Sequence, residues 1–254
     1  MSRTELTAKL VSIAREAGDV LMKHYSGDIV QRKKADNSPV TAADEEAEAL
    51  ILRRLGEVAP AIPVVAEESA AAGRLPNIGT SPFFLVDPLD GTKEFLNHNG
   101  EFTVNIALIE HGIPVAGVVF APAIGRMFWG ADIQAFEENS AATKPIRTRT
   151  APETGLTAIA SRSHRDAATD EFLSRHRIAS IVSAGSSLKF CVLAAGEADI
   201  YPRMGPTMEW DTAAGHAVLR AAGGRVTLVD TTTDLTYGNA ESGFRNPFFI
   251  AWGR

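Results

Sequence analysis

The residues best suited to chemistry form one acidic turn, Asp87-Pro88-Leu89-Asp90-Gly91-Thr92. Its two carboxylates follow the apolar run 83–86, which predicts a buried strand. Pro88 fixes one backbone torsion, and Gly91 allows the backbone to approach a ligand closely. Such a turn can direct both carboxylates and the Leu89 carbonyl at one point, and hard oxygen ligands at this density suit Mg²⁺. The amides of Gly91 and Thr92 would open the next helix, where backbone donors favour a phosphate.

Three further acidic residues stand in suggestive positions. Glu67 follows the predicted strand 64–66 within Glu67-Glu68-Ser69, and Asp211 belongs to Trp210-Asp211-Thr212-Ala213-Ala214-Gly215. Taken singly, each also fits a turn, a helix cap or a solvated position. Asp44 stands three residues after Thr41 and matches the acidic position of a capping box.

The surrounding pattern predicts the elements that would hold these motifs. Apolar residues recur at helical spacing over 6–21, a short strand is expected at 30–34, and a second helix begins at Thr41. Strands at 102–110 and 115–120 would flank a turn at 111–114, and strands at 127–129 and 134–136 would continue an antiparallel meander.

The polar stretch 139–154 contains two prolines and predicts a boundary between two lobes, 1–145 and 146–254. Strand and helix patterns then alternate at 156–160, 167–176, 178–183 and 187–195, and a last helix at 211–222 ends at Gly223-Gly224. The pattern predicts a mixed α/β protein whose first lobe is rich in antiparallel strands.

Composition excludes several classes of protein. The chain has 254 residues, of which 45% are hydrophobic and 22% charged, as in an ordinary globular protein. A net charge of −6 argues against binding a nucleic acid polymer. No apolar run approaches the roughly 20 residues of a transmembrane helix, and the N-terminus lacks a signal-peptide pattern. A single cysteine, Cys191, fits a reducing compartment, so we expect a cytoplasmic protein.

Together, the motifs at Glu67, Asp87–Thr92 and Asp211 resemble the inositol monophosphatase superfamily in order and separation. The resemblance runs from about Thr41 to the C-terminus. It implies the layered αβαβα sandwich of the sugar phosphatases, with two closely packed lobes and the active site between them. It also implies two or three Mg²⁺ ions acting on a phosphate ester.

Specific roles follow from this resemblance. Glu67, Asp87 and the Leu89 carbonyl would hold one Mg²⁺, and Asp87, Asp90 and Asp211 a second. The nucleophile would be a water molecule activated with help from Thr92 and, through it, Asp44, while Glu67 orients the same water. Substrate contacts are expected from these residues: Glu67, Leu89, Asp90, Gly91, Thr92 and Asp211.

The metal motifs do not choose the substrate, but three other segments carry cations or hydroxyls. Gly185-Ser186-Ser187-Leu188-Lys189 opens a predicted helix, Ser161-Arg162-Ser163-His164 follows a predicted strand, and Tyr201-Pro202-Arg203 precedes Asp211. Lys189, Arg203 and His164 would neutralise a second phosphate. Alternatively, Lys189 and Arg203 are solvated and Ser186 is only an N-cap.

These segments, with Lys93-Glu94-Phe95 and Asn99-Gly100-Glu101-Phe102-Thr103, look closest to the 3'(2'),5'-bisphosphate nucleotidase branch. The resemblance implies hydrolysis of 3'-phosphoadenosine 5'-phosphate to AMP and phosphate in sulfur metabolism. The related 3'-phosphoadenylyl sulfate is a second candidate substrate, and inhibition by lithium is typical of such enzymes.

Three other functions are alternatives to a bisphosphate nucleotidase. Ser186 to Lys189 also satisfies the Ser-x-x-Lys motif of penicillin-recognising hydrolases, but no Ser-Asp-Asn or Lys-Thr-Gly partner follows. A non-catalytic phosphate-binding protein would be favoured by loss of Thr92 or of a metal carboxylate, and none is missing. Hydrolysis of an inositol or sugar monophosphate is the serious rival. The sequence leaves oligomeric state and peripheral attachment to the inner membrane open.

Overall fold

The computed structural model describes residues 1–27, 31–33, 39–160 and 167–254. One outer layer of the fold consists of two helices. These are α1 (Arg3–Tyr25) and α2 (Ala42–Val58). Both begin with a capping box, formed by Ser2 with Glu5 and by Thr41 with Asp44. The apolar positions predicted for the first helix are buried on one face, where they pack against the first sheet. The start of α2 at Thr41 is also as predicted.

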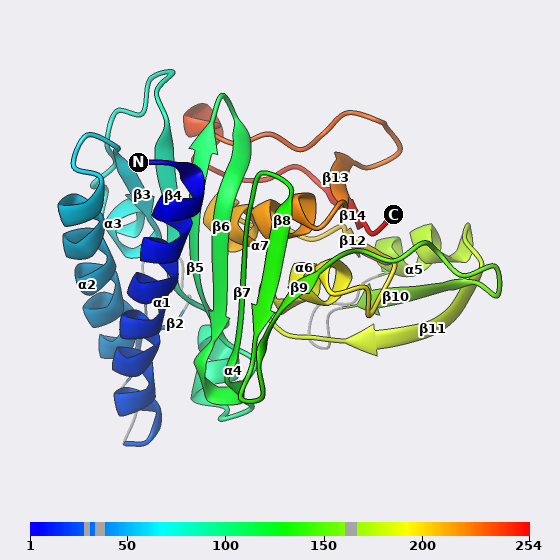
Figure 1. Cartoon of the computed structure of the whole chain (residues 1–254), viewed down its shortest axis with the longest axis horizontal. Helices are drawn as coiled ribbons and strands as arrows, with labels where there is room; N and C mark the ends of the chain where they lie inside the picture. The colour runs from blue at the N-terminus through cyan, green and yellow to red at the C-terminus, as the bar shows by residue number, and fades with distance from the viewer. Residues whose placement is uncertain (28–30, 34–38, 161–166) are drawn as a thin grey trace.

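Seven strands form the first sheet in the order β3-β4-β5-β6-β7-β8-β9 (Figure 1). β3 and β4 are parallel, and every later pair is antiparallel, as the meander pattern predicted. The strands are β3 (Val64–Ala66), β4 (Phe83–Asp90), β5 (Thr103–Glu110), β6 (Ile113–Ala121), β7 (Arg126–Ala131), β8 (Gln134–Glu138) and β9 (Thr143–Ile146).

The predicted turn at 111–114 is wrong in length. Only His111 and Gly112 form it, both with positive φ, because Ile113 and Pro114 already pair with Glu110 and Ile109. β9 lies inside the polar stretch 139–154, where no strand was predicted.

A central layer of two helices, α6 (Leu188–Ala194) and α7 (Glu209–Ala221), lies between the two sheets (Figure 1). α7 packs very closely on β6 and β7. A Cβ added at Gly117 would stand 2.6 Å from the Ala214 carbonyl oxygen, and one at Gly130 would stand 2.8 Å from Ala221 Cβ. The glycines therefore set the distance between the helix and the sheet.

The second sheet has five strands in the order β11-β10-β12-β14-β13. They are β10 (Leu156–Ala160), β11 (Ile178–Ser183), β12 (Ile200–Arg203), β13 (Arg225–Leu228) and β14 (Phe249–Trp252). Helix α5 (Ala167–Ser174) covers its other face through Phe172 and Leu173. The sequence predicted β10, α5, β11 and α6, but it did not predict the last three strands. The layers follow the predicted αβαβα order, so that prediction is confirmed.

Short elements connect these layers. They are β1 (Gln31–Lys33), β2 (Pro39–Thr41), α3 (Glu67–Ala71), α4 (Thr92–Leu96) and the 3₁₀ turns η1 (Pro122–Ile124) and η2 (Ala240–Ser242). The strand predicted at 30–34 corresponds to β1, and its end residues lie outside the described residues. Among the helices of the described part of the chain, none is long and apolar enough to cross a membrane.

The first sheet ends at Ile146 and the second begins at Leu156, so the predicted lobe boundary falls near the change of sheet. Because α7 belongs to the second half of the chain yet packs on the first sheet, the halves interlock. The division into lobes 1–145 and 146–254 stays a prediction.

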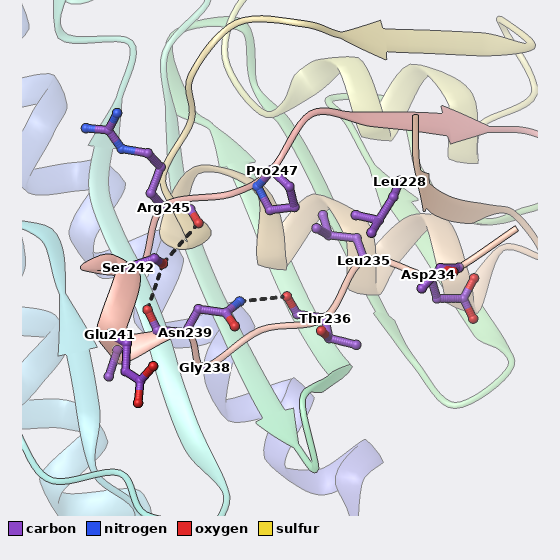
Figure 2. A pocket seen from close by; sticks show the side chains of 12 residues that line it. Leu228, Asp234, Leu235, Thr236, Gly238, Asn239, Glu241, Ser242, Arg245 and Pro247 are labelled. Carbon is purple, nitrogen blue, oxygen red and sulfur yellow. Dashed lines mark hydrogen bonds between the residues drawn. The ribbon is translucent and has the colours of Figure 1, made fainter. Parts of the chain in front are cut away.

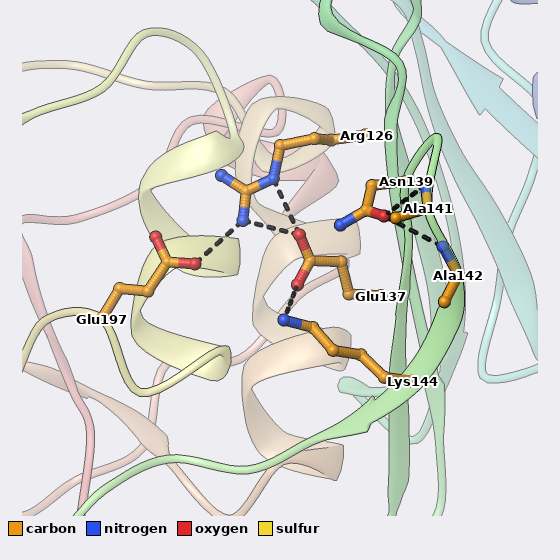
Figure 3. A network of polar contacts seen from close by, with 7 residues as sticks. All are labelled: Arg126, Glu137, Asn139, Ala141, Ala142, Lys144 and Glu197. Carbon is orange, nitrogen blue, oxygen red and sulfur yellow. Dashed lines mark hydrogen bonds and ion pairs between the residues drawn. The ribbon is translucent and has the colours of Figure 1, made fainter.

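An ion-pair network ties the first sheet to the turn that leads into β12 (Figure 3). Arg126 on β7 pairs with Glu137 on β8 at 2.7 Å and with Glu197, beyond α6, at 2.9 Å. Lys144 on β9 contacts the other oxygen of Glu137 at 3.2 Å. Because the Glu137 side chain is only 2% exposed, this network is screened less than a surface pair.

We predict opposite effects for one substitution at two glycines. Gly117→Ala should lower the free energy of unfolding by about 1–3 kcal/mol, because its Cβ meets backbone that cannot move away. Gly56→Ala, at an exposed position of α2 with no atom within 4 Å of the added Cβ, should raise it by about 0.4–1 kcal/mol. Urea denaturation measures both, and equal effects would contradict the close packing of α7.

Candidate active site

The acidic turn continues strand β4 instead of following it. The sequence predicted a strand that ends at Asp87. That end is wrong, because β4 continues to Asp90, which pairs with Thr103 on β5 as Asp87 pairs with Asn105. The register shifts between these pairs, so Pro88 and Leu89 bulge from the ladder. The Leu89 N–H donates to Asp87 Oδ1 at 2.9 Å, which stabilises the bulge.

Gly91 closes the turn in a backbone conformation that suits glycine. Its φ is 90°, and an added Cβ would overlap the Ser186 hydroxyl. Gly91 is thus required both by its torsion and by the approach of the Ser186 loop. Thr92 then begins the five-residue helix α4, as predicted.

The four predicted metal carboxylates interact with one another. Burial raises the pKa of Asp87 well above its ordinary value, and the negative charges of Glu67, Asp90 and Asp211 add to the shift. The pKa of Asp211 is also raised well above its ordinary value, first by burial and then by Asp90 and Glu67. Residues from α3, β4 and α7 are therefore brought into one electrostatic neighbourhood.

Asp90 experiences opposing effects. Burial raises its pKa to about 6, although Lys189 and a hydrogen bond from Ser187 favour the ionised form. A cation placed among these carboxylates would favour ionisation of all of them.

The donor chemistry fits Mg²⁺, because every predicted ligand is a hard oxygen, and burial and mutual repulsion raise the pKa values of Asp87 and Asp211. Within the described ranges, no group of three or more His, Cys, Asp or Glu side chains is arranged as it stands to hold a metal ion. Such groups consist of side chains alone, whereas the predicted ligand set also includes the backbone carbonyl of Leu89. In addition, ionised carboxylates without a bound cation repel one another. The ligand roles of Glu67, Asp87, Leu89, Asp90 and Asp211 stay predictions.

Thr92 and Asp44 lie beside this cluster. Thr92 Oγ1 stands 3.5 Å from both Asp44 Oδ1 and the Leu89 carbonyl oxygen. Asp44 Oδ2 accepts hydrogen bonds from the N–H and the hydroxyl of Thr41 at 2.8 and 2.7 Å. The capping role inferred for Asp44 is therefore present, and its second oxygen faces Thr92.

Glu48 is a site residue that the sequence analysis missed. Its carboxylate accepts from the N–H groups of Glu68 and Ser69 at 2.7 and 2.8 Å and from the Ser69 hydroxyl at 2.6 Å. It lies on α2, is 4% exposed, and caps α3, the helix that begins at Glu67. Its only local sign was its position one helical turn after Asp44 on a predicted helix.

Ser186 takes a structural position. Its backbone is left-handed, with φ 46°, and its hydroxyl lies 2.8 Å from the Glu101 carbonyl and 3.0 Å from the Asp90 carbonyl. It is not the N-cap of α6, which is Ser187. A substrate contact by Ser186 stays a prediction.

Lys189 and Arg203 lie close enough to the acidic cluster to act on Asp90 and Asp211. Lys189 is 7% exposed, and its Nζ donates to the Ser186 carbonyl at 2.9 Å and stands 5.7 Å from the centre of the Tyr201 ring. Burial lowers the pKa of Lys189 to about 8, although Asp90 favours its charged form. The alternative of a solvated lysine is therefore wrong. Arg203 acts on the pKa values of both Lys189 and Asp211 and donates from Nη2 to the Pro206 carbonyl at 3.0 Å. His164 lies outside the described residues.

The start of α7 is held by the loop between β13 and β14. Glu209, fully buried, accepts from the N–H groups of Gly238 and Asn239 at 2.7 and 2.9 Å. Asn246 Nδ2 donates to the Met208 carbonyl at 2.8 Å. The predicted helix start at Asp211 is wrong by two residues because Asp211 Oδ2 accepts from the Met208 N–H at 2.8 Å within the first turn.

This loop also lines a pocket of about 710 Å³. The lining side chains are drawn in Figure 2. Hydrogen bonds of Asn239 to Thr236 and of Ser242 to Asn239 and Arg245 shape its wall. None of the predicted site residues that the structure describes lines it. The pocket therefore lies at the loop that holds the start of α7, and the acidic cluster does not line it.

Comparison with known proteins gives a consistent result. The model of the inositol monophosphatase family matches residues 2–247. A 3'(2'),5'-bisphosphate nucleotidase CysQ from Shigella flexneri is 48% identical over 222 residues, covering 86% of this chain and 88% of the relative. One from Salmonella typhimurium is 46% identical over 243 residues, covering 95% and 97%.

Solved structures agree with this assignment. CysQ from Bacteroides thetaiotaomicron superposes with a TM-score of 0.82 at 35% identity, covering 98% of this chain and 97% of that one. An inositol monophosphatase from Anabaena gives a TM-score of 0.76 at 27% identity, covering 98% and 90%. By motif order, layered fold and these similarities, the chain belongs to the inositol monophosphatase family.

Proposed function

We propose that this chain is a Mg²⁺-dependent 3'(2'),5'-bisphosphate nucleotidase that converts 3'-phosphoadenosine 5'-phosphate to AMP and phosphate. The observation that carries the substrate choice is the placement of two cations, Lys189 and Arg203, beside the acidic residues Asp90 and Asp211. Relatives named as such nucleotidases share 46–48% identity over most of the chain. The reaction belongs to sulfur metabolism.

The acidic cluster is the proposed metal site. Glu67, Asp87, Asp90, Asp211 and the Leu89 carbonyl would hold Mg²⁺, which supplies neutralising charge on the phosphoryl oxygens and a lowered pKa for water. The buried Asp87 is central to this proposal, because its charge interacts with all three other carboxylates. Glu67 would orient the attacking water.

Thr92 and Asp44 would handle the proton of that water. Thr92 Oγ1 would accept it while its own hydrogen moves toward Asp44 Oδ1, 3.5 Å away. Thr41 donates to Asp44 Oδ2, which leaves Asp44 oriented with Oδ1 toward Thr92.

The remaining contacts would position the substrate. The Gly91 and Thr92 amides would bind the phosphate that is cleaved, and Lys189 and Arg203 would bind the second phosphate. Ser186 and His164 complete the proposed substrate set. 3'-Phosphoadenylyl sulfate is a second candidate substrate, and cytoplasmic location and lithium inhibition stay predictions.

A substrate panel tests the proposal directly. Phosphate release should be measured with Mg²⁺ for 3'-phosphoadenosine 5'-phosphate, inositol 1-phosphate and fructose 1,6-bisphosphate. We expect the nucleotide to give the highest kcat/KM, because it alone offers two phosphates joined by a nucleoside. The fold similarity to an inositol monophosphatase makes inositol 1-phosphate the relevant rival, and its preference would overturn the assignment.

Asp90→Asn should abolish turnover, with a loss beyond the roughly 100-fold typical of residues that only support a metal ligand. Removing a buried charge from among other carboxylates should not lower the melting temperature in EDTA. Steady-state kinetics and thermal unfolding measure the two effects. Retained turnover would contradict the metal site.

Lys189→Ala should raise KM for the nucleotide by about 10–100-fold, as expected for losing a hydrogen bond to a charged group. With a pKa of about 8, Lys189 is mostly protonated at pH 7. KM for a simple monophosphate should change far less. Lys144→Ala, which removes a lysine that is 57% exposed on β9, is the matched control. Equal effects of Lys189→Ala on both substrates would remove the second-phosphate site.

A further inference from the structure

Ser187 stands where the two halves of the acidic cluster meet. Its Oγ lies 3.1 Å from Asp90 Oδ2, on β4, and 2.5 Å from the Asp211 carbonyl oxygen, on α7. The side chain is 1% exposed. A serine at the N-cap position of a helix usually caps it, but the Ser187 hydroxyl makes no cap hydrogen bond. Its single hydrogen instead has two acceptors within reach, one on each acidic residue.

Asn105 supports Ser187 from the sheet. It is fully buried on β5, directly opposite Asp87, and its Nδ2 donates to Ser187 Oγ at 3.0 Å. Its Oδ1 is buried without a hydrogen-bond partner among the described residues. A hydrophobic residue of the same shape would avoid that unsatisfied oxygen, so stability alone does not explain an asparagine here.

We propose that Asn105 and Ser187 are positioning residues that fix Asp90 relative to Asp211 for metal binding. This inference rests on the proposed function, since it assigns both acidic residues to one Mg²⁺ site. Asn105 orients the Ser187 lone pairs, and the Ser187 hydroxyl then holds one carboxylate oxygen of Asp90 next to the backbone of Asp211. Groups that hold a metal ligand from behind are typically worth 10–100-fold in metal affinity.

Ser187→Ala tests this role. The dissociation constant for Mg²⁺, measured by isothermal titration calorimetry on the metal-free protein, should rise by about 10–100-fold. Thr227→Val is the matched control, because it also removes a buried hydroxyl. Thr227 lies on β13, and its Oγ1 accepts a hydrogen bond from Trp252 Nε1 at 3.3 Å. The control should bind Mg²⁺ within about twofold of the wild type, an ordinary margin for a site outside the network.

Asn105→Leu separates positioning from stability. It removes the donor to Ser187 and the unsatisfied oxygen together, so the free energy of unfolding should stay equal or rise. Mg²⁺ affinity should nevertheless fall by roughly 3–10-fold, less than the loss of a group that touches the ligand itself. Because Asn105 acts through Ser187, the double variant Asn105→Leu/Ser187→Ala should bind Mg²⁺ as Ser187→Ala does.

Three results would overturn the inference. Mg²⁺ affinity of Ser187→Ala within twofold of the wild type would remove the role of Ser187, and additive losses in the double variant would remove the relay from Asn105. If the wild type binds no Mg²⁺, the metal site fails and the inference fails with it. A different preferred substrate would overturn only the proposed function, because calorimetry uses the metal alone. Should Ser187→Ala fail to fold, Asn105→Leu alone decides, since unchanged Mg²⁺ affinity there would contradict the proposal.

Discussion

Repulsion between buried carboxylates is the constraint around which this structure is arranged. Asp87 is buried and Asp211 is half-buried, and both stand within reach of each other's charge and of Glu67 and Asp90. Burial positions them, and the same burial disfavours their ionised forms. Backbone hydrogen-bond donors partly offset this effect, because they stabilise the ionised carboxylates. The Leu89 N–H donates to Asp87 and the Met208 N–H donates to Asp211. Bound Mg²⁺ would supply the remaining compensation.

Helix α7 brings Asp211 to the carboxylates of the first sheet. Its position against β6 and β7 depends on the absence of side chains at Gly117 and Gly130, and its first turn is tied to the β13–β14 loop by Glu209. Asp211 therefore reaches the carboxylates of β4 only when helix, sheet and loop are all packed. The site is a product of tertiary packing, although each carboxylate stands in a short local motif.

In the proposed function, substrate choice depends on the two cations beside the acidic cluster. Lys189 is buried against Tyr201 and close to Asp90, and Arg203 acts on both Lys189 and Asp211. Two cations next to an acidic cluster suit a substrate with two separated phosphates better than one with sugar hydroxyls. In a chain with a net charge of −6, the overall composition does not show that two cations stand beside the acidic cluster.

The sequence alone predicted the family, the layered fold and the nucleotidase branch, and the comparisons confirm all three. These predictions depended on short motifs and local periodicity, such as the apolar face of α1 and the capping box at Thr41 and Asp44, which neighbouring residues alone determine. The roles of the site residues remain predictions.

Only the tertiary structure decided which residues support the acidic ones. Glu48 contacts residues 20 and 21 positions away, Asn105 contacts Ser187 across 82 positions, and Glu209 contacts Gly238 across 29. Strands β12 to β14 and the extension of β4 to Asp90 likewise depend on pairing with distant segments. A local pattern reports what a residue prefers among its neighbours in the chain. Contacts between distant segments form only when the layers pack, so their energies leave no periodic trace in the sequence.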